Sequence, residues 1–480
     1  MKDFHMLIGG KAMPAANGGT FEVTAPATGA VLAQVPRAGA GDVDCAVRAA
    51  VRGFEAWYRL RPAEREAALL RAASLAEAEG QARFLDTLID ESGSTITKAR
   101  GEIAYTVDLL RTAAGEARRL YGETFPNDDP HRMSLVIREP LGVVGVVSPY
   151  NAPLSLLTKM CAFPLAAGNS LVIKPSEETP LTALAFGRLL LDAGVPPEAV
   201  SVVTGFGAEC GAELINHPDV RCIALTGSTN TGIAVGQAGL TKMRRMQLEL
   251  GGKSALLVLK DMDPVKAAKI AAQGIFTHSG QICMANSRIA VEREIYQPFI
   301  EALKAEAESL YLGDLREERT VYGPLINARA VEKVLEHVRA AVDGGAKILT
   351  GGEIYKGLVV KPTVLLDPPR DSLAWREESF GPVTSVVAVD DLQEAIDVAN
   401  DSEYGLSAAV LTSNLQWGLH AARRIASGAV HIGTHSFQSN ALAPIGGVGL
   451  SGMGRSGGHY STEEFTEVKW ISVDVGSLPC

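Results

Sequence analysis

Cys283, Glu249 and Asn151 are the residues whose types could together carry out covalent catalysis. Cys283 lies in the polar segment THSGQICMANSR, which the sequence pattern places in a loop between a helix and a strand, where reactive groups are often presented. A thiol in such a loop can attack an electrophile once its pKa is lowered or a nearby base removes its proton. The alternative is a structural thiol, because cysteine ranks among the most buried residue types.

Glu249 and Asn151 have side chains that could assist such a thiol. Glu249 lies near the end of the apolar run MQLEL, and Gly251 and Gly252 follow it, so no bulky side chain blocks the approach. A carboxyl in apolar surroundings has a raised pKa and can act as a general base. Asn151 follows the buried strand predicted in GVVGVVSP, and its amide could donate to an oxyanion. The alternatives are a solvent-facing Glu on an edge strand and an Asn that ends a strand in a turn.

Two further segments have features of a nucleotide site. TGSTNTG runs from a predicted strand into a predicted helix, with Gly227 and Gly232 on either side of the turn, where backbone N–H groups can hold a phosphate. Its spacing is not that of the G-x-G-x-x-G fingerprint. IKPSE ends another strand with Lys174 and Glu177, and a carboxylate there can bind ribose hydroxyls and repel a 2′-phosphate. Singly, each segment is more typical of an ordinary strand–turn–helix.

The elements that would position these residues alternate along the chain. Residues 41–119 have helical periodicity, with Pro62 near the start of a second helix and Gly80 at its end. Short apolar runs predict strands at residues 142–149, 170–176, 199–203, 222–228, 246–250, 254–259, 288–292 and 346–352. Helices are predicted at residues 179–194, 231–238, from 263 onward, 296–310 and 328–345. This alternation predicts an α/β fold of βαβ units with mostly parallel sheets.

Composition and charge exclude several classes of protein. The chain has 480 residues, 46% hydrophobic and 21% charged, which is typical of a globular protein of several domains. Its formal net charge of -10 argues against a nucleic-acid partner. No signal peptide and no apolar stretch of about 20 residues is present, so no membrane partner and a cytoplasmic location are expected. No metal is expected, because no zinc-type spacing occurs among the six cysteines: Cys45, Cys161, Cys210, Cys222, Cys283 and Cys480.

Two α/β domains are predicted, with the boundary near Gly251 and Gly252. Residues 463–475, EEFTEVKWISVDV, alternate apolar and polar side chains as a strand does. A strand at a chain end needs an edge to pair with, either in its own chain or in another subunit.

Together these segments resemble the aldehyde dehydrogenase superfamily. The resemblance lies in SPYNAPL, IKPSEETPL, ALTGSTNTG, LELGGKSA, SGQICMANSR, EESFGPV and GGVGLSGMGR, which occur in the family's order, with Cys283 34 residues after Glu249. It implies a Rossmann-like parallel-sheet NAD-binding domain (residues 1–122 and 141–250) and an α/β catalytic domain (residues 251–449). It also implies a small β oligomerisation flap (residues 123–140 and 450–480).

The resemblance assigns catalytic roles to the three residues named first. Cys283 would attack the aldehyde carbon to form a thiohemiacetal, and the Asn151 side chain and the Cys283 backbone N–H would hold the oxyanion. Hydride would then pass to the nicotinamide and leave a thioester. Glu249 would activate the water that hydrolyses the thioester, and would help to deprotonate Cys283.

The resemblance also assigns the cofactor site. The adenosine ribose, the pyrophosphate and the nicotinamide ribose and ring would be held by Lys174, Glu177, Gly207, Gly227, Ser228, Glu378, Phe380 and Tyr150. Lys174 and Glu177 would hold the adenosine ribose, and Glu378 the nicotinamide ribose. Ser228 would contact the pyrophosphate, while Gly207 and Gly227 allow close backbone approach. The charge of Glu177 favours NAD over NADP.

The substrate side departs from the commonest family pattern. Many members carry Trp-Lys in the helix after the catalytic Asn, where this chain has Lys159 and Met160. Vanillin, salicylaldehyde and benzaldehyde dehydrogenases, the most similar group, often carry a basic residue there and share NAPL. The apolar Ile282 and Met284 flank Cys283, so an aromatic or bulky apolar aldehyde is expected. Lys159 would contact a polar or anionic substituent of the substrate, or it is a solvated helix lysine.

Two rival functions remain at this point. A CoA-acylating semialdehyde dehydrogenase would resolve the thioester with CoA, but such relatives typically lack the Glu that stands here as Glu249. A catalytically silent relative with a structural role would usually lose the Cys or a nucleotide residue, and here the set is complete. A homodimer or homotetramer is expected, because the family's subunits pair through the segment near Met133–Glu139 and the C-terminal strand.

Overall fold

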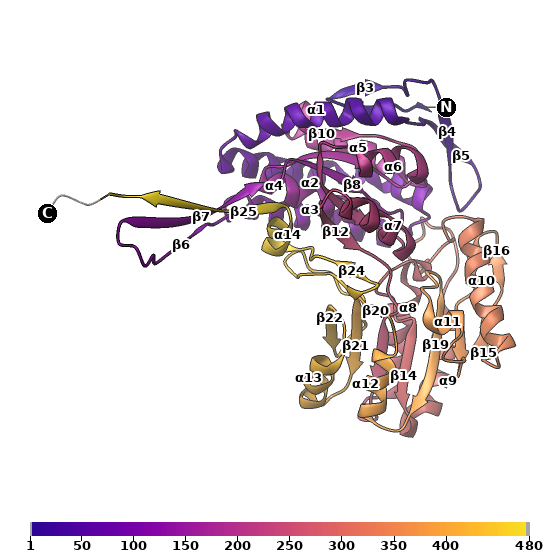
Figure 1. Cartoon of the computed structure of the whole chain (residues 1–480). Helices are drawn as coiled ribbons and strands as arrows, with labels where there is room; N and C mark the ends of the chain where they lie inside the picture. Colours follow the sequence, from indigo (N-terminus) through magenta and orange to yellow (C-terminus); the bar gives the residue numbers. More distant parts are fainter. Residues whose placement is uncertain (1, 477–480) are drawn as a thin grey trace.

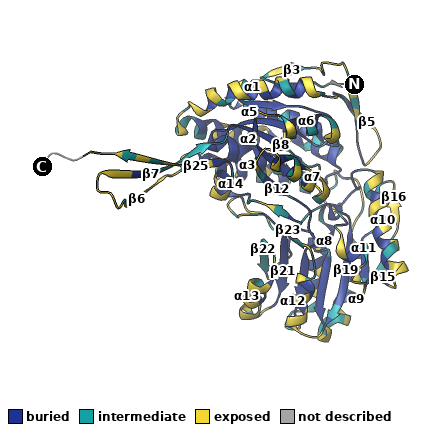
Figure 2. Cartoon of the chain, viewed as in Figure 1, coloured by how far each residue is buried: buried dark blue, intermediate teal, exposed yellow. Residues whose placement is uncertain are grey.

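Two predominantly parallel sheets, each flanked by helices, form the framework of the protein, and a narrow flap projects from one side (Figure 1). The computed structural model describes residues 2–476, so Cys480 lies outside the described residues. The strands of both sheets are largely buried, whereas the outer faces of the helices and much of the flap are exposed (Figure 2). The predicted α/β fold is confirmed.

The first sheet has eight strands in the order β24-β12-β11-β8-β9-β10-β2-β3. Their bounds are β24 (Gly452–Met453), β12 (Arg245–Glu249), β11 (Val220–Thr226), β8 (Val143–Val147), β9 (Ser170–Lys174), β10 (Val200–Val202), β2 (Met6–Ile8) and β3 (Lys11–Met13). The five strands from β8 to β12 are parallel, and the short strands at either edge are antiparallel. The connections between the parallel strands contain α4 (Ser155–Ala167), α5 (Pro180–Asp192), the short α6 (Ala212–Asn216) and α7 (Thr229–Leu240).

The order of these strands creates a crevice suited to a ligand. The chain places β9 and β10 on one side of β8, and then places β11 and β12 on the other side. Open α/β sheets bind ligands at such a reversal, beyond the carboxyl ends of the strands. Asn151 follows β8, and Gly227 follows β11, so both lie at this reversal.

The helical region begins with α1 (Ala40–Tyr58), α2 (Pro62–Ser92) and α3 (Ile96–Glu116), as the periodicity predicts. The predicted helix end at Gly80 is wrong, because α2 continues to Ser92 and ends at Gly93, whose φ is 67°. A Cβ on Gly80 would lie 2.7 Å from Cγ2 of Ile103. A side chain at residue 80 would therefore clash with α3. The periodicity of one helix does not reveal this contact, because it depends on how two helices pack.

The second sheet has seven strands in the order β15-β18-β19-β14-β13-β21-β22, and all but the edge strand β15 run parallel. Their bounds are β15 (Lys347–Thr350), β18 (Thr363–Leu366), β19 (Val383–Val389), β14 (Arg288–Glu292), β13 (Ala255–Val258), β21 (Ser407–Leu411) and β22 (Ala429–Ile432). Helices α8 (Pro264–Phe276), α9 (Arg293–Ser309), α10 (Ala328–Asp343), α12 (Leu392–Asn400) and α13 (Leu415–Arg424) accompany them. The sequence pattern does not predict the strands β18, β19, β21 and β22 of this sheet individually.

The flap is a three-stranded antiparallel sheet of β6 (Glu123–Phe125), β7 (Arg132–Pro140) and β25 (Thr466–Asp474). The strand predicted in the tail finds its edge in its own chain, since β25 pairs with β7 from Thr466 opposite Pro140 to Asp474 opposite Arg132. The strand begins later than predicted, because α14 (Gly458–Glu464) precedes it. Residues 450–464 also lie outside the flap: β24 pairs with β12, and α14 packs on α3 and α4.

No helix among residues 2–476 is long and apolar enough to cross a membrane.

Candidate active site

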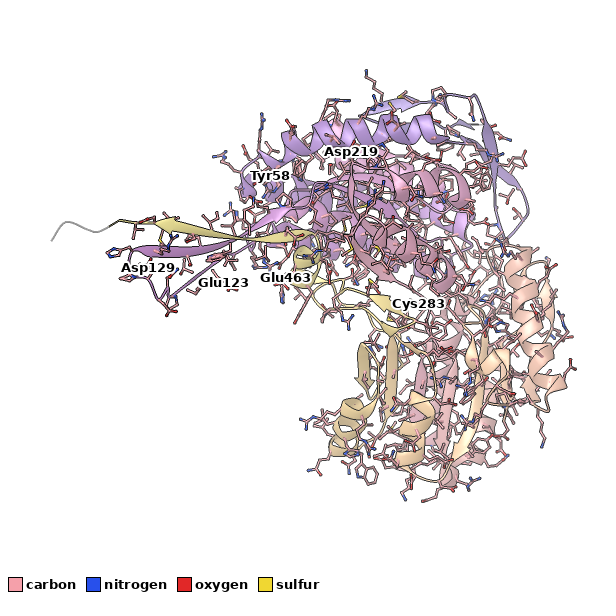
Figure 3. All side chains as sticks on the ribbon, in the orientation of Figure 1. Tyr58, Glu123, Asp129, Asp219, Cys283 and Glu463 are labelled. Atoms are coloured by element: carbon pink, nitrogen blue, oxygen red, sulfur yellow. The ribbon has the colours of Figure 1, made fainter. Side chains whose placement is uncertain are left out.

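Cys283 lies where the parts of the molecule that carry the two large sheets meet (Figure 3). Its loop connects the short helical turn η3 (Thr277–Gly280) to β14. Three consecutive residues of that turn have positive φ angles: His278 (50°), Ser279 (58°) and Gly280 (70°). Such a run is strained for residues other than glycine and is held only by surrounding structure. The chain is therefore turned sharply just before the thiol.

The two glycines after Glu249 allow the cysteine loop to approach β12. A Cβ on Gly252 would lie 2.3 Å from the Cys283 carbonyl oxygen, and a Cβ on Gly251 would lie 2.7 Å from Oε2 of Glu378. Neither distance is compatible with a side chain. Any larger residue at these positions would push Cys283 or Glu378 away from the end of β12.

Glu249 is the last residue of β12 and is half-buried. The alternative of a solvent-facing Glu on an edge strand is wrong, because β24 covers the outer side of β12 at Leu248 and Glu249. Oε1 of Glu249 is shielded from solvent and has no hydrogen-bond partner among the described residues. Desolvation raises the pKa of Glu249, while the charges of Lys159 and Arg455 partly oppose that rise. The carboxyl is thus a base with a free acceptor oxygen.

The thiol of Cys283 is half-buried and protonated at neutral pH. Desolvation raises its pKa to about 12; the charges of Glu378 and Glu249 add to this effect, and Lys159 opposes it. A thiol with so high a pKa attacks only if a base accepts its proton as the bond to carbon forms. Cys161, Cys210 and Cys222 are buried in the first part of the chain, and Cys45 is exposed.

Asn151 is buried, and its Nδ2 donates a hydrogen bond of 2.9 Å to the carbonyl oxygen of Gln281. The side chain therefore does not close a local turn but reaches the loop of Cys283, two residues before the thiol. Gln281 is held in turn, because its Oε1 accepts a bond of 3.0 Å from the N–H of Ile326. An amide nitrogen carries two hydrogens, so Asn151 keeps a second donor for a ligand.

Lys159 lies in α4 and is 5% exposed, so the alternative of a solvated helix lysine is wrong. Burial lowers its pKa, while the nearby charges of Glu249 and Cys283 raise it. None of the hydrogen bonds or ion pairs among residues 2–476 involves its ammonium, and Nζ is not among the unpartnered polar atoms that are shut off from solvent. An ammonium on a nearly buried side chain without a partner in the chain needs an acceptor from water or from a ligand.

The apolar residues expected beside the thiol differ in exposure. Met284 is 8% exposed, and Ile282 is half-buried. The Met284 carbonyl oxygen accepts a 2.5 Å hydrogen bond from Oγ of Ser436, which ties the cysteine loop to the segment after β22.

The residues expected to hold the adenosine half of NAD follow the carboxyl ends of β9, β10 and β11. Nζ of Lys174 and Oε2 of Glu177 form an ion pair of 3.0 Å, which leaves the other carboxylate oxygen available. Ser228 caps α7, with its Oγ accepting from the N–H of Thr231 at 3.3 Å. A Cβ on Gly207 would meet no atom within 4 Å, and one on Gly227 only Leu225 at 3.7 Å. The backbone is open here, as close approach by a pyrophosphate requires.

The residues expected at the nicotinamide half meet near Gly252. Oε1 of Glu378 accepts a 3.0 Å bond from the Gly252 N–H, and desolvation raises the pKa of Glu378. The rings of Tyr150 and Phe380 lie edge to face, with centroids 5.9 Å apart. Phe380 has a φ of 52°, an unusual value for a residue with a side chain. The residue types at these positions suit the riboses, the pyrophosphate and the nicotinamide of a dinucleotide.

Three residues around Asn151 belong to the site in the structure, but no sequence motif gives them a role. Gln281 lies inside SGQICMANSR, where only the thiol stands out as reactive. Lys98 and Glu102 lie on α3, and Lys98 reaches the Asn151 carbonyl across 53 residues of sequence. Their only signal is an i,i+4 charge pair, which usually marks a solvated helix face.

An open parallel sheet with this reversal of strand order is suited to bind a dinucleotide, and here the loop of Cys283 lies beside it. The chain belongs to the aldehyde dehydrogenase family, whose sequence model matches residues 13–471.

Characterised relatives cover nearly the whole chain. Glutarate-semialdehyde dehydrogenase of Pseudomonas putida is 37% identical over 98% of this chain and 97% of its own length. Vanillin dehydrogenase of Pseudomonas fluorescens is 37% identical over 99% of each chain. These names include both a semialdehyde and an aromatic aldehyde, so they do not decide between the two substrate classes.

Solved structures are similar over the same extent. A NAD-dependent aldehyde dehydrogenase from Sinorhizobium meliloti has a TM-score of 0.96 and 36% identity, covering 100% of this chain and 96% of its own. An NADP-dependent enzyme of E. coli has a TM-score of 0.96 and 34% identity, covering 98% of each chain. The family therefore includes similar members for either cofactor.

Proposed function

We propose that the protein oxidises an aldehyde to the carboxylic acid with NAD, through a thiohemiacetal and a thioester on Cys283. The observation that carries this proposal is the carboxyl of Glu249, which has a raised pKa and an unpartnered Oε1 and lies close enough to the Cys283 thiol for its charge to affect the thiol's pKa. A protonated thiol beside a carboxyl with an unpartnered oxygen suits covalent catalysis once that carboxyl is ionised.

In the proposed mechanism, Glu249 accepts the thiol proton as Sγ of Cys283 attacks the aldehyde carbon. The free amide hydrogen of Asn151 and the Cys283 N–H, which bonds to no other described residue, would then hold the oxyanion. NAD, held by Lys174, Glu177, Ser228 and Glu378, would supply the acceptor for the hydride of the thiohemiacetal carbon. Once its proton is released, Glu249 takes a proton from the water that attacks the thioester, and Cys283 leaves as the thiol.

The presence of Glu249 supports hydrolysis over transfer of the acyl group to CoA. A base with an unpartnered oxygen is what an attacking water requires. Product formation that requires CoA would contradict this assignment.

For the substrate we propose an aromatic or otherwise bulky apolar aldehyde. The apolar flanks of the thiol, Ile282 and Met284, support this class, as does the likeness to vanillin dehydrogenase. One observation favours a second candidate, a semialdehyde with a carboxylate, because the buried ammonium of Lys159 would pair well with such a group. A hydroxyl-substituted aromatic aldehyde would satisfy both features.

The first test is NADH formation, followed by its near-ultraviolet absorbance. The panel contains benzaldehyde, hydroxybenzaldehydes, straight-chain aldehydes and the succinate and glutarate semialdehydes. We expect the highest kcat/KM with a hydroxybenzaldehyde. No NADH with any aldehyde, together with retained NAD binding, would instead support a catalytically silent relative.

Replacing Lys159 by Met should separate substrates by their polar group. We expect kcat/KM to fall about 10- to 100-fold more for a hydroxybenzaldehyde or an acidic semialdehyde than for benzaldehyde, because a hydrogen bond to a charged group is lost. The decisive quantity is the ratio of the kcat/KM values for two substrates, because a change in the pKa of Glu249 would affect all substrates alike. Equal losses across the panel would mean that Lys159 contacts no substrate.

We propose NAD as the preferred cofactor because the Glu177 carboxylate, although paired with Lys174, would lie beside a 2′-phosphate. The wild-type enzyme should show a higher kcat/KM with NAD than with NADP. Glu177→Gln should lower the ratio of kcat/KM for NAD to kcat/KM for NADP, because the variant has no carboxylate to repel the 2′-phosphate. A wild-type preference for NADP would overturn the assignment.

We propose that the flap mediates a homodimer or homotetramer. It exposes apolar side chains that a monomer would leave in water: Phe125, Met133, Val468 and Trp470 are between 43% and 62% exposed. Light scattering should give a mass of two or four chains, and a mass of one chain would exclude the assembly.

A further inference from the structure

Lys98 is a nearly buried lysine that binds the backbone of Asn151. Its side chain is 17% exposed and lies in the first turn of α3. Nζ donates to the Asn151 carbonyl at 2.8 Å, to Oγ of Ser94 at 2.9 Å and to Oε2 of Glu102 at 2.5 Å. These three hydrogen bonds use all the donors of the ammonium, so its position is determined.

The carboxylate of Glu102 holds the other side of the same segment. It is 3% exposed, and its Oε1 accepts from the N–H groups of Leu154 at 2.7 Å and Ser155 at 3.0 Å. These N–H groups lie at the start of α4 and have no acceptor within that helix. A negative charge at a helix N-terminus is also stabilised by the helix dipole. The Lys98–Glu102 pair therefore ties residues 151–155 to α3.

The side chain of Asn151 is held separately from its backbone. Nδ2 donates to the Gln281 carbonyl at 2.9 Å, so one amide hydrogen is engaged and the direction of the other follows from the backbone position. Lys98 determines that position through the carbonyl of the same residue. Two anchors, one on the backbone and one on the side chain, thus define where the free hydrogen points.

We propose that Lys98 and Glu102 are positioning residues that aim the free amide hydrogen of Asn151 at the oxyanion of the thiohemiacetal. This inference rests on the proposed function, since it needs an oxyanion to be formed there. A donor stabilises a developing charge most when it is held in place before the reaction, because no reorganisation is then required. Lys98 touches neither substrate nor thiol and acts only through Asn151.

The test is a double-mutant cycle of Lys98→Met and Asn151→Ala, read as kcat and as the KM values for aldehyde and NAD. Lys98→Met alone should lower kcat by about 10- to 100-fold, which is below the loss from removing an oxyanion donor outright, and should leave the KM for NAD unchanged. In the Asn151→Ala background the same change should lower kcat less than about twofold. Additive losses would show that Lys98 does not act through Asn151, and would overturn the proposal.

Two further variants separate positioning from a general effect on folding. Arg100→Met removes an ion pair with Glu318 on the exposed face of the same helix and should leave kcat unchanged. Glu102→Gln keeps the size and an acceptor oxygen but removes the charge beside Lys98, so it should lower kcat with the same non-additivity. It replaces Lys98→Met in the cycle if that variant does not fold. An inactive wild-type enzyme would refute the proposed function; an active wild type with fully active Lys98→Met would refute this inference alone.

Discussion

Cys283→Ala is expected to lower kcat for aldehyde oxidation by on the order of 10⁴-fold or more, because the variant has no group that can form the covalent intermediate. The thiol lies on the loop between the two sheet-bearing parts, beside the carboxyl of Glu249 and the ammonium of Lys159. Neither neighbour can replace it in this mechanism, because a carboxylate adds poorly to an aldehyde and an amine would form an imine rather than a thioester. NADH absorbance over a long incubation at high enzyme concentration measures the residual rate.

Cys45→Ala is the matched control for this experiment. Cys45 is exposed on α1, far from the loop in sequence, and should be replaceable without loss of activity. NAD binding to Cys283→Ala should be retained, because none of the residues proposed to hold the cofactor changes. Substantial oxidation by Cys283→Ala would exclude the thioester mechanism.

Glu249→Gln is expected to lower steady-state kcat by about 10²- to 10⁴-fold, the usual contribution of a general base. Gln has nearly the same shape but cannot accept a proton from water or from the thiol. If the hydrolysis of the thioester is the step most affected, rapid mixing should show one equivalent of NADH formed quickly, followed by a slow phase. Electrospray mass measurement of the protein in the slow phase should detect the acyl group on Cys283.

The pH dependence of the wild-type enzyme should report the same carboxyl. The folded-state pKa of Glu249 is raised by desolvation, so at low pH the carboxyl is protonated and inactive as a base. As pH rises through that raised pKa, the carboxylate forms and kcat rises with it. In Glu249→Gln this increase should be absent over the same range.

Glu377→Gln serves as the control for the loss of a carboxylate near the site, since Glu377 is exposed beside Glu378. It should keep both kcat and the pH profile. A Glu249→Gln variant with the wild-type rate and the wild-type profile would show that another group activates water. A rate restored in that variant by CoA would mean that the thioester can be resolved without the base.

Burial raises the pKa of both groups, which weakens the thiol as a nucleophile and strengthens the carboxyl as a base. Desolvation raises the pKa of the Cys283 thiol to about 12, which makes the free thiolate rare, and it also raises the pKa of Glu249, which makes that carboxyl a stronger base. The positive charge of Lys159 lowers the pKa of both. The proton is therefore transferred most readily when the aldehyde is already in place and sulfur begins to bond to carbon.

Local sequence determined much of the fold. Apolar runs of five to eight residues predicted β8, β9, β11, β12, β13 and β14 to within a few residues, because a strand buried on both faces needs a continuous apolar segment. Residue types at strand ends also identified candidates for the thiol, the base and the amide. Both kinds of information lie in residues that are neighbours along the chain.

The tertiary structure alone decided what lies next to what. Lys159 could be a solvated or a buried lysine until the packing of α4 placed it beside Glu249, and Gly80 could end a helix until α3 was seen to pack against it. Lys98 reaches Asn151 across 53 residues, and the Asn151 amide reaches Gln281 across 130. Periodicity predicts which face of an element is buried but not which element covers it, because that depends on how distant segments pack together.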